Sequence, residues 1–240
     1  MSKIAFVFPG QGSQYVGMCK AFYDQYPIAR QLFEEADDAL GFSLTKMCFE
    51  GPEADLRLTY NTQPAILTAS TICGEILKQH GVSADIAAGH SLGEYSALVN
   101  AGAMKFADAV RIVRQRGQFM QEAVPVGEGS MSAVMGLANE KIVEICQQVE
   151  TETGLPVQAV NFNCPGQVVI SGTEEGIDTA CAKLLEAGAK RAMKLKVGGA
   201  FHSPLMEPAK VELEAAIQAT EIKTPKCPVY QNVDALPHTD

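Results

Sequence analysis

The chain has 240 residues, which suits one large domain or one domain carrying an insert, and it can bury a substantial core. Hydrophobic residues make up 47% of the sequence and charged residues 20%, close to an ordinary globular protein. The 19 Lys and Arg against 28 Asp and Glu give a net charge of −9. This balance argues against non-specific nucleic-acid binding and against docking on an anionic membrane face, so neither partner is expected.

The seven cysteines are scattered along the chain and form neither a CxxC pair nor a zinc-like spacing with histidine. An odd, scattered set is typical of reduced thiols, so we expect a cytoplasmic protein whose cysteines pack as small buried apolar residues. The longest apolar run near the start, at positions 4–8, is too short for a signal-peptide core or a membrane span.

The first half of the chain predicts strands that alternate with helices. A short apolar run at 3–8 ends at Pro9-Gly10 and predicts a buried strand, and a second strand is predicted at 85–89. Apolar residues at helical spacing predict helices at 28–40, at 62–80 with Pro64 in its first turn, and at 107–123. This alternation favours a mostly parallel sheet covered by helices.

A different order of elements follows. Strands are predicted at 132–137, 157–161, 167–171 and 192–197, and helices at 139–153 and 175–187. The order β-α-β-β-α-β is that of a ferredoxin-like unit, which needs a sheet of its own. We therefore predict an inserted ferredoxin-like small subdomain at 129–197 within a large α/β subdomain at 1–128 and 198–240. In the second part of the large subdomain, a helix from Pro204 and a strand near Val229 resume the first pattern.

The sequence Gly89-His90-Ser91-Leu92-Gly93 is a GxSxG motif between a predicted strand and a helical stretch. In this context the chain turns so sharply that side chains two residues before and after the serine would clash, which explains the glycines. The serine hydroxyl then projects at the carboxyl end of the strand, and the Leu92 N–H can donate to an oxyanion. We predict that Ser91 is a nucleophile; the alternative is an ordinary helix-capping serine.

A nucleophilic serine needs a base, and the chain has four histidines. Three of them occupy a helix end, a polar tail and a position facing away from the serine, namely His80, His238 and His90. His202 follows a glycine pair and precedes Ser203-Pro204, a typical N-cap with proline at the first helical position. We therefore expect His202 in a strand-to-helix loop, on the same rim of the sheet as Ser91, as the general base.

The predicted helix at 107–123 holds an arginine in its apolar stripe. On a helical wheel, Arg116 falls in the middle of this stripe, whereas Arg111 and Arg114 project away from it, as solvated arginines do. A buried guanidinium is costly unless an anion pairs with it. The residues leave two possibilities open: an internal Asp or Glu partner, or a substrate carboxylate held bidentately.

The loop Pro9-Gly10-Gln11-Gly12-Ser13-Gln14 follows the first predicted strand. It lacks the third glycine of the dinucleotide fingerprint and the Gly-Lys-Ser/Thr of a Walker A motif. A glycine-flanked loop at the carboxyl end of a strand can instead supply a second oxyanion N–H, here from Gln11. From the residues alone this indication is weak.

Together these motifs resemble the malonyl-CoA:acyl carrier protein transacylase family. The match runs over essentially the whole chain, in ordered blocks: PGQGSQ at 9–14, NTQPAILTAS at 61–70, GHSLGEYSAL at 89–98, RQRGQFMQEA at 114–123, NFNCPGQVVISG at 161–172 and AFHSPLM at 200–206. The resemblance implies a hydrolase-like large subdomain with a parallel sheet and a ferredoxin-like small subdomain, in agreement with the predicted elements.

The resemblance also implies roles for individual residues. Ser91 would be the nucleophile, His202 its base, and Arg116 the residue that binds the malonyl carboxylate. The remaining implied positions are the two N–H donors of the oxyanion hole, Gln11 and Leu92, and two polar residues lining the family's cleft, Gln63 and Asn161.

The implied activity is transfer of a malonyl group from malonyl-CoA to the phosphopantetheine thiol of acyl carrier protein, through a malonyl-serine, in fatty-acid biosynthesis. No metal or tightly bound cofactor is implied, and we expect a monomer. Cys164 stands where the family usually has serine. Family members also continue well past Asp240, with a stretch that completes the large subdomain and carries the glutamine whose carbonyl orients the catalytic histidine. On this resemblance we expect the large subdomain to be incomplete at its C-terminal end.

Other functions compete with this one. A serine hydrolase wants an acid between Ser91 and His202 in chain order, but Asp178 lies in the predicted insert and Asp108 begins the Arg116 helix. A non-catalytic carrier-binding relative would not need the serine, histidine and arginine intact. A discrete enzyme that loads malonyl units in a polyketide pathway catalyses the same chemistry as the fatty-acid enzyme, so the sequence does not distinguish the two.

Basic side chains cluster late in the predicted small subdomain, at Lys183, Lys190, Arg191, Lys194 and Lys196. A solvated helix and strand face is the ordinary explanation for such a run. The entering thiol, however, arrives on an acidic carrier, and an acidic enzyme needs a local basic patch to avoid repelling it. We therefore predict that this cluster contributes to carrier docking.

Overall fold

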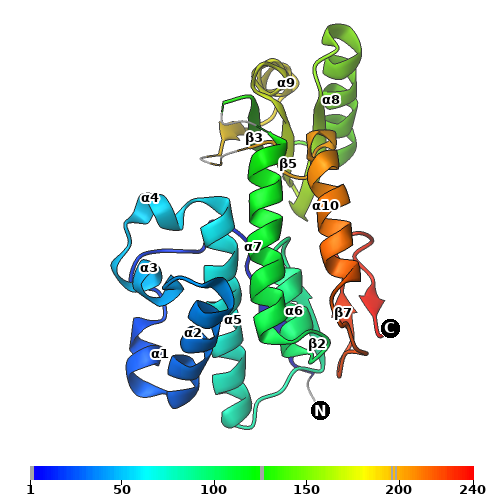
Figure 1. Ribbon diagram of the computed structural model, residues 1–240. Helices are drawn as coiled ribbons and strands as arrows, with labels where there is room; N and C mark the ends of the chain where they lie inside the picture. Colours follow the sequence, from blue (N-terminus) through cyan, green and yellow to red (C-terminus); the bar gives the residue numbers. More distant parts are fainter. Residues whose placement is uncertain (1–2, 125–126, 196, 198) are drawn as a thin grey trace. The chain divides into compact units, whose positions relative to one another are not determined.

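The computed structural model describes residues 3–124, 127–195, 197 and 199–240. The chain forms two compact units: the serine unit, Met1–Gln118 with Leu213–Asp240, and the histidine unit, Phe119–Glu212. The divisions fall inside two helices, α7 (Phe106–Ala123) and α10 (Glu207–Gln218) (Figure 1).

These divisions lie further out than the predicted boundaries at 128/129 and 197/198. The end of α7 and the start of α10 pack into one apolar cluster with the strands of the histidine unit. The buried members of this cluster are Met120, Met131, Ala133, Val169, Phe201 and Ala209. Glycine-rich turns mark where a chain can change direction, but side-chain packing decides which unit the end of a helix joins.

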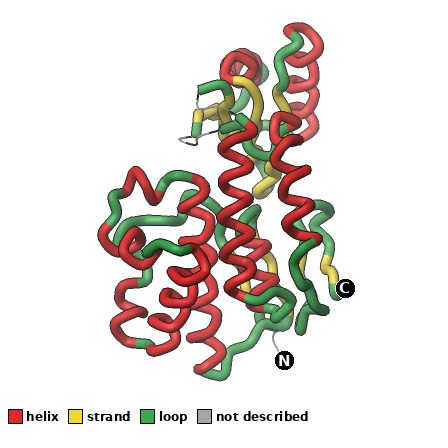
Figure 2. The backbone as a smooth tube through the Cα atoms, in the orientation of Figure 1, coloured by secondary structure: helices red, strands yellow, loops and turns green. Residues whose placement is uncertain are grey.

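The sheet of the serine unit has the strand order β1-β2-β7-β8, made by Ala5–Phe8, Ile86–Gly89, Val229–Tyr230 and Pro237–His238 (Figure 2). β1 pairs with β2, and β2 with β7, in parallel, as the alternating sequence pattern predicts. β8 adds an antiparallel edge that sequence analysis missed, because a two-residue strand carries no periodicity.

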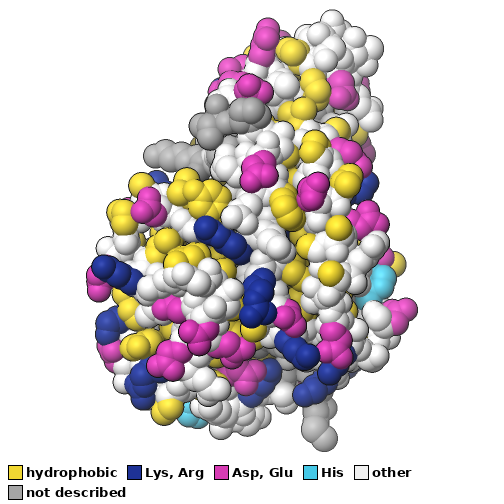
Figure 3. All heavy atoms as spheres, viewed as in Figure 1, with side chains coloured by type: hydrophobic (Ala, Val, Ile, Leu, Met, Phe, Trp, Pro, Cys, Tyr) yellow, Lys and Arg dark blue, Asp and Glu magenta, His cyan; other side chains and the backbone are white. Residues whose placement is uncertain are grey.

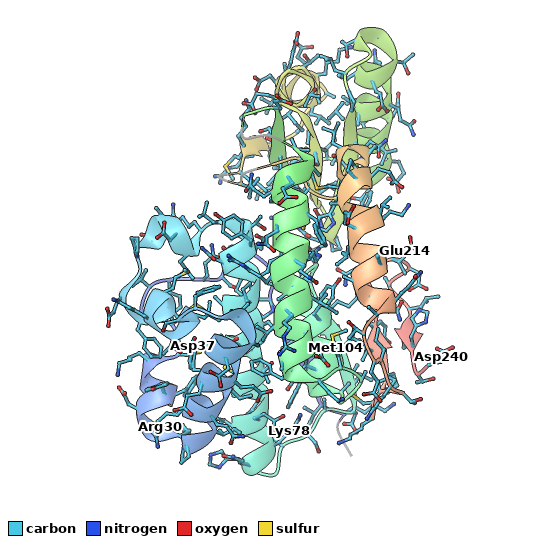
Figure 4. All side chains as sticks on the ribbon, viewed as in Figure 1. Arg30, Asp37, Lys78, Met104, Glu214 and Asp240 are labelled. Atoms are coloured by element: carbon cyan, nitrogen blue, oxygen red, sulfur yellow. The ribbon has the colours of Figure 1, made fainter. Side chains whose placement is uncertain are left out.

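The helices of the serine unit pack together in the largest apolar cluster of the chain's described part. In chain order they are α1 (Lys20–Gln25), α2 (Pro27–Leu40), α3 (Leu44–Glu50), α4 (Glu53–Leu56), α5 (Thr59–Gln79) and α6 (Gly93–Asn100), followed by α7. α6 also packs against β1, β2 and β7. The predicted helices α2, α5 and α7 are present, and α2 ends at Gly41 in the left-handed conformation with φ of 74°. Lys78, labelled in Figure 4, lies near the end of α5. Its Nζ donates to the carbonyl of Asn100, at the end of α6, at 3.0 Å.

Pro64 lies inside α5 rather than in its first turn, because the helix begins three residues before the predicted start. Proline has no N–H to donate to the carbonyl four residues earlier, that of Tyr60. The Arg114 guanidinium of α7 donates to this carbonyl instead, at 2.9 Å, and lies over the Tyr60 ring at 4.6 Å from its centroid. Arg114 is therefore half-buried, and the prediction that it is solvated was wrong; Arg111 is exposed as predicted.

The histidine unit contains its own antiparallel sheet, with the strand order β4-β5-β3-β6. Its elements are β3 (Gly129–Met135), α8 (Asn139–Thr153), β4 (Val157–Cys164), β5 (Gln167–Thr173), α9 (Glu174–Glu186), β6 (Arg191–Lys194) and the 3-10 helix η1 (Pro204–Met206). The predicted order of strands and helices in this stretch is confirmed. β6 is shorter than the predicted 192–197, of which residue 196 lies outside the described residues.

All seven cysteines are free thiols, but they are not all buried as predicted. Cys48 and Cys146 are buried, and burial raises the pKa of each thiol to about 12. Cys73 and Cys164 are exposed. A hydrogen bond with the Cys19 thiol lowers the pKa of Cys73 to about 7.

Acidic and basic side chains are interspersed over the face of the serine unit that Figure 3 presents. In the described part of the chain, no helix combines the length and apolar character needed to cross a membrane.

Candidate active site

The GxSxG segment forms the tight turn that its sequence predicts. β2 ends at Gly89, α6 begins at Gly93, and Ser91 between them has a φ of 51°, in the left-handed region. A Cβ on Gly89 would lie 1.8 Å from the carbonyl carbon of Gly93, and one on Gly93 would lie 2.3 Å from the carbonyl oxygen of Phe8. The two glycines are therefore required by close backbone approach, and the predicted clash is confirmed.

Arg116 is buried beside this turn, with 8% of its surface exposed. Its Nη1 donates to Gln63 Oε1 at 2.7 Å, its Nη2 donates to Ser91 Oγ at 3.0 Å, and its guanidinium lies over the Tyr95 ring. Burial lowers the pKa of Arg116 from its ordinary value. Arginine nonetheless stays protonated in proteins, so the site carries a desolvated positive charge.

No carboxylate within the described residues lies at ion-pair distance from Arg116. Of the two possibilities that the sequence leaves open, an internal Asp or Glu partner is therefore not found in this part of the chain. A buried cation with neutral partners attracts an anion strongly, because little water competes for it. The arrangement can bind a carboxylate next to the Ser91 hydroxyl.

A chain of hydrogen bonds connects Arg116 with the loop after β1. Gln63 is fully buried on α5, accepts from Arg116, and donates through Nε2 to Thr59 Oγ1 at 3.1 Å. Thr59 Oγ1 in turn donates to Gln11 Oε1 at 2.5 Å. Sequence analysis missed Thr59, although its spacing of four residues from Gln63 puts both on one face of a helix.

Two backbone donors belong to residues next to the Ser91 turn: Leu92 follows Ser91, and Gln11 follows Gly10, whose backbone lies against His90. The N–H groups of Gln11 and Leu92 donate to no other protein group within the residues that the structure describes. The Leu92 side chain is fully buried, which holds its peptide in place. The Ser91 N–H, by contrast, donates to Asn232 Oδ1 at 2.7 Å, a contact that sequence analysis missed. Gln11 and Leu92 thus have the unoccupied donors that an oxyanion hole needs.

The other predicted residues belong to the histidine unit. His202 is exposed and has a φ of 62°, another left-handed residue in a tight turn. Ser203 follows it and caps η1, donating to the Ala200 carbonyl at 2.7 Å and accepting from the Leu205 N–H at 3.3 Å. The predicted cap is therefore present. Asn161 is half-buried on β4, paired in register with Val169.

The serine unit accordingly brings together five of the predicted residues, Gln11, Gln63, Ser91, Leu92 and Arg116. The set predicted from the sequence is thus divided between the two units, with His202 and Asn161 in the histidine unit.

A family model described as an acyl transferase domain matches residues 5–240. The malonyl CoA-acyl carrier protein transacylase of Bacillus subtilis (strain 168) is 53% identical over 235 residues, which is 98% of this chain and 74% of the relative. The chain belongs to this transacylase family. The protein of the same name from Escherichia coli (strain K12) is 48% identical over 241 residues, 100% of this chain and 77% of the relative.

Solved structures agree with this family membership. The malonyl CoA-acyl carrier protein transacylase of Coxiella burnetii superposes with a TM-score of 0.96 at 44% identity, covering 99% of this chain and 75% of that one. A malonyl-transacylase in complex with a holo type II PKS acyl-carrier protein has a TM-score of 0.96 at 44% identity, covering 100% and 77%. The chain spans about three quarters of the length of these transacylases.

Proposed function

We propose that the protein transfers the malonyl group of malonyl-CoA to the phosphopantetheine thiol of acyl carrier protein, in fatty-acid biosynthesis. The observation that carries the proposal is the buried Arg116 guanidinium, which contacts Ser91 Oγ and has no carboxylate partner in the described part of the chain. Malonyl differs from acetyl by one carboxylate, and a planar guanidinium binds a carboxylate through two parallel hydrogen bonds. A simple esterase, whose substrate need not carry a carboxylate, would not require a buried guanidinium beside its nucleophile.

In the first half-reaction, Ser91 Oγ attacks the thioester carbonyl of malonyl-CoA. A guanidinium has no acceptor, so the Ser91 hydroxyl accepts from Arg116 and must donate its own proton elsewhere. We assign His202 as the base that takes this proton and returns it to the departing thiolate of coenzyme A. The N–H groups of Gln11 and Leu92 are the proposed donors to the tetrahedral oxyanion, and each such donor is worth roughly 3–4 kcal/mol in comparable enzymes.

In the second half-reaction, the carrier's thiol gives its proton to His202 and attacks the malonyl-serine ester; His202 then returns the proton to the departing Ser91 Oγ, which leaves the malonyl-carrier product and the free enzyme. Gln63 holds the guanidinium through its hydrogen bond from Arg116 Nη1, and Asn161 is proposed to line the substrate cleft. These steps use side chains, backbone donors and the two thioesters, so the proposal includes no metal or bound cofactor. We further propose a cytoplasmic monomer that acts on neither nucleic acid nor membranes.

We also propose that the histidine unit is a ferredoxin-like subdomain inserted into a hydrolase-like large one. The sheet order β4-β5-β3-β6 and the two helices α8 and α9 support the first part. The parallel pairing of β1, β2 and β7, with the serine at the end of β2, supports the second.

Mass spectrometry of the intact protein after mixing with malonyl-CoA tests the proposal. We expect an adduct of about 86 Da, the mass of a malonyl group held as a covalent intermediate, that is absent from Ser91→Ala. Adding holo acyl carrier protein should move the adduct to the carrier. Loss of the adduct to water at the same rate without carrier would instead indicate a hydrolase, and an adduct that survives in Ser91→Ala would overturn the nucleophile assignment.

The carrier used in that experiment also separates the two pathways. A fatty-acid carrier that accepts malonyl faster than a polyketide carrier supports the main proposal. The reverse preference supports the alternative, a discrete acyltransferase that loads malonyl units for a polyketide pathway. The observation that favours this alternative is the solved complex of a similar malonyl-transacylase with a type II PKS acyl-carrier protein.

A further inference from the structure

Asn232 follows β7 and contacts the Ser91 turn from a position 141 residues away in the sequence. We propose that Asn232 is a positioning residue that holds the backbone of the nucleophile turn in its reactive geometry. The inference rests on the proposed function for its kinetic consequences, but its structural basis is independent of the substrate.

The Asn232 side chain bridges three points of the turn. Its Oδ1 accepts from the Ser91 N–H at 2.7 Å, and its Nδ2 donates to the Gly89 carbonyl at 2.8 Å and to Glu94 Oε2 at 2.5 Å. The Asn232 backbone N–H also donates to Glu94 Oε2, at 2.7 Å. One side chain therefore connects the end of β2, the nucleophile and the first turn of α6.

The polarity of these contacts suits an amide and no other side chain of this size. The Ser91 N–H needs an acceptor, whereas the Gly89 carbonyl and the Glu94 carboxylate both need a donor. Only one orientation of the Asn232 amide satisfies all three, and Glu94 fixes the backbone from which the amide projects. An aspartate would place a second carboxylate oxygen against Glu94 and against the Gly89 carbonyl.

This bridge acts on the least relaxed residue of the turn. Ser91 has a positive φ, which a non-glycine residue adopts only when its surroundings hold it there. By binding the Ser91 N–H, Asn232 also fixes the next peptide, whose Leu92 N–H is the proposed oxyanion donor. A displacement of about 1 Å at reacting groups can cost about 10²-fold in rate. Both half-reactions use the same turn, so both depend on the bridge.

Asn232 is exposed, so its hydrogen bonds compete with water and its replacement leaves most of the core intact. For Asn232→Ala we expect kcat to fall about 10²-fold in each half-reaction, with KM changed less than about twofold and the malonyl-to-acetyl ratio unchanged. Asn232→Asp should be worse, because it sets two carboxylates together. Val233→Ala is the matched control, since Val233 lies in the same loop, is 86% exposed and should react like the parent.

Rescue distinguishes positioning from a general loss of structure. Glu94→Gln in the Asn232→Asp background replaces the repelling carboxylate by an amide that can donate to it. We expect this double variant to recover at least about tenfold over Asn232→Asp alone. A double variant no faster than the single one overturns the bridge geometry.

Labelling of Ser91 by a small fluorophosphonate gives a readout that needs no malonyl-CoA. We expect Asn232→Ala to label about 10–10²-fold more slowly than the parent. If the parent labels but transfers no malonyl, the proposed function fails while slower labelling of the variant still supports positioning. A variant that labels at the parental rate, or that shows a smaller active fraction but parental kcat per active serine, overturns positioning. A parent whose Ser91 does not label overturns both.

Discussion

Both units bury hydroxyl side chains, but among the described residues only the serine unit also buries side-chain amides and a guanidinium. Among the described residues of the serine unit, the buried polar groups include a guanidinium and three side-chain amides, on Arg116, Asn61, Gln63 and Asn100. In the histidine unit, the buried polar groups are serine hydroxyls, on Ser130, Ser132, Ser171 and Ser203. An amide or a guanidinium has several polar atoms that need hydrogen-bond partners, whereas a hydroxyl has a single oxygen.

This difference separates two ways of building a site. The serine unit holds its reactive groups by a buried hydrogen-bond network, in which Arg116 contacts both Gln63 and the nucleophile. The strands and helices of the histidine unit pack around an apolar core. The candidate base of this unit, His202, lies exposed in a loop. Substitution of the buried Arg116 should therefore change specificity together with packing, whereas substitution of the exposed His202 should change rate without changing stability.

The largest effect is expected for His202→Ala, which should slow formation of the malonyl-enzyme by roughly 10²–10⁴-fold. The free energy of unfolding should be unchanged, because the side chain is exposed. Stopped-flow acylation and urea unfolding measure the two quantities, with His80→Ala, an exposed histidine of the serine unit, as the control.

The pH dependence of His202→Ala tests the same assignment more directly. The residual rate should no longer depend on a group that titrates near neutral pH, where histidine ordinarily does. A variant that kept the parental pH–rate profile would show that another residue is the base. The histidine unit would then not supply the base of the reaction.

Arg116→Ala should lower kcat/KM for malonyl-CoA by roughly 10–10²-fold more than for acetyl-CoA, because acetyl has no carboxylate to pair with the guanidinium. Acetyl transfer is expected to hold steady or rise, since a desolvated charge is removed. Arg111→Ala is the matched control on the same helix, as Arg111 is exposed and pairs with Asp108 at 3.1 Å. Equal losses for both donors would mean that Arg116 only supports the fold.

The smallest effect concerns the basic cluster of the histidine unit, of which Lys196 lies outside the described residues. Lys183 pairs with Glu152, and Lys194 pairs with Glu174 and Asp178, so their charges are partly neutralised. Lys190 and Arg191 are exposed, and no carboxylate in the described chain lies within ion-pair distance of either. They are the members best able to attract an acidic carrier.

Changing Lys190 and Arg191 together to Glu should raise the KM for the carrier several-fold, and more at low salt, where charges are screened less. The KM for malonyl-CoA should change less. Changing Lys141 and Lys210 together to Glu, both exposed in the same unit, controls for the same change in net charge. Carrier kinetics that stay constant across a salt series would place the docking surface elsewhere and leave the cluster as ordinary solvated surface.

The sequence predicted the parts of the protein that depend on neighbours in the chain. Helix α8 has the predicted bounds, and the order of elements in the histidine unit follows from periodicity and from turn residues such as Cys164-Pro165-Gly166. The GxSxG turn was also predicted from its sequence, because Gly89 is required by backbone atoms of Gly93 only four residues away, although Gly93 is itself required by the distant Phe8 carbonyl. Local spacing was enough for these features.

Only the tertiary structure decided how the buried polar groups are paired. Arg116 meets Gln63 across 53 residues of sequence, and Ser91 meets Asn232 across 141, distances at which periodicity carries no information. Arg114 was mispredicted for the same reason, because a helical wheel shows only one helix and places this side chain in solvent. In the structure Arg114 donates to the Tyr60 carbonyl of another helix, which lacks its usual donor because Pro64 has no N–H. Residue types and local spacing thus determined which elements form and where the nucleophile lies, whereas the partners of each charge and amide were decided by which helices pack together.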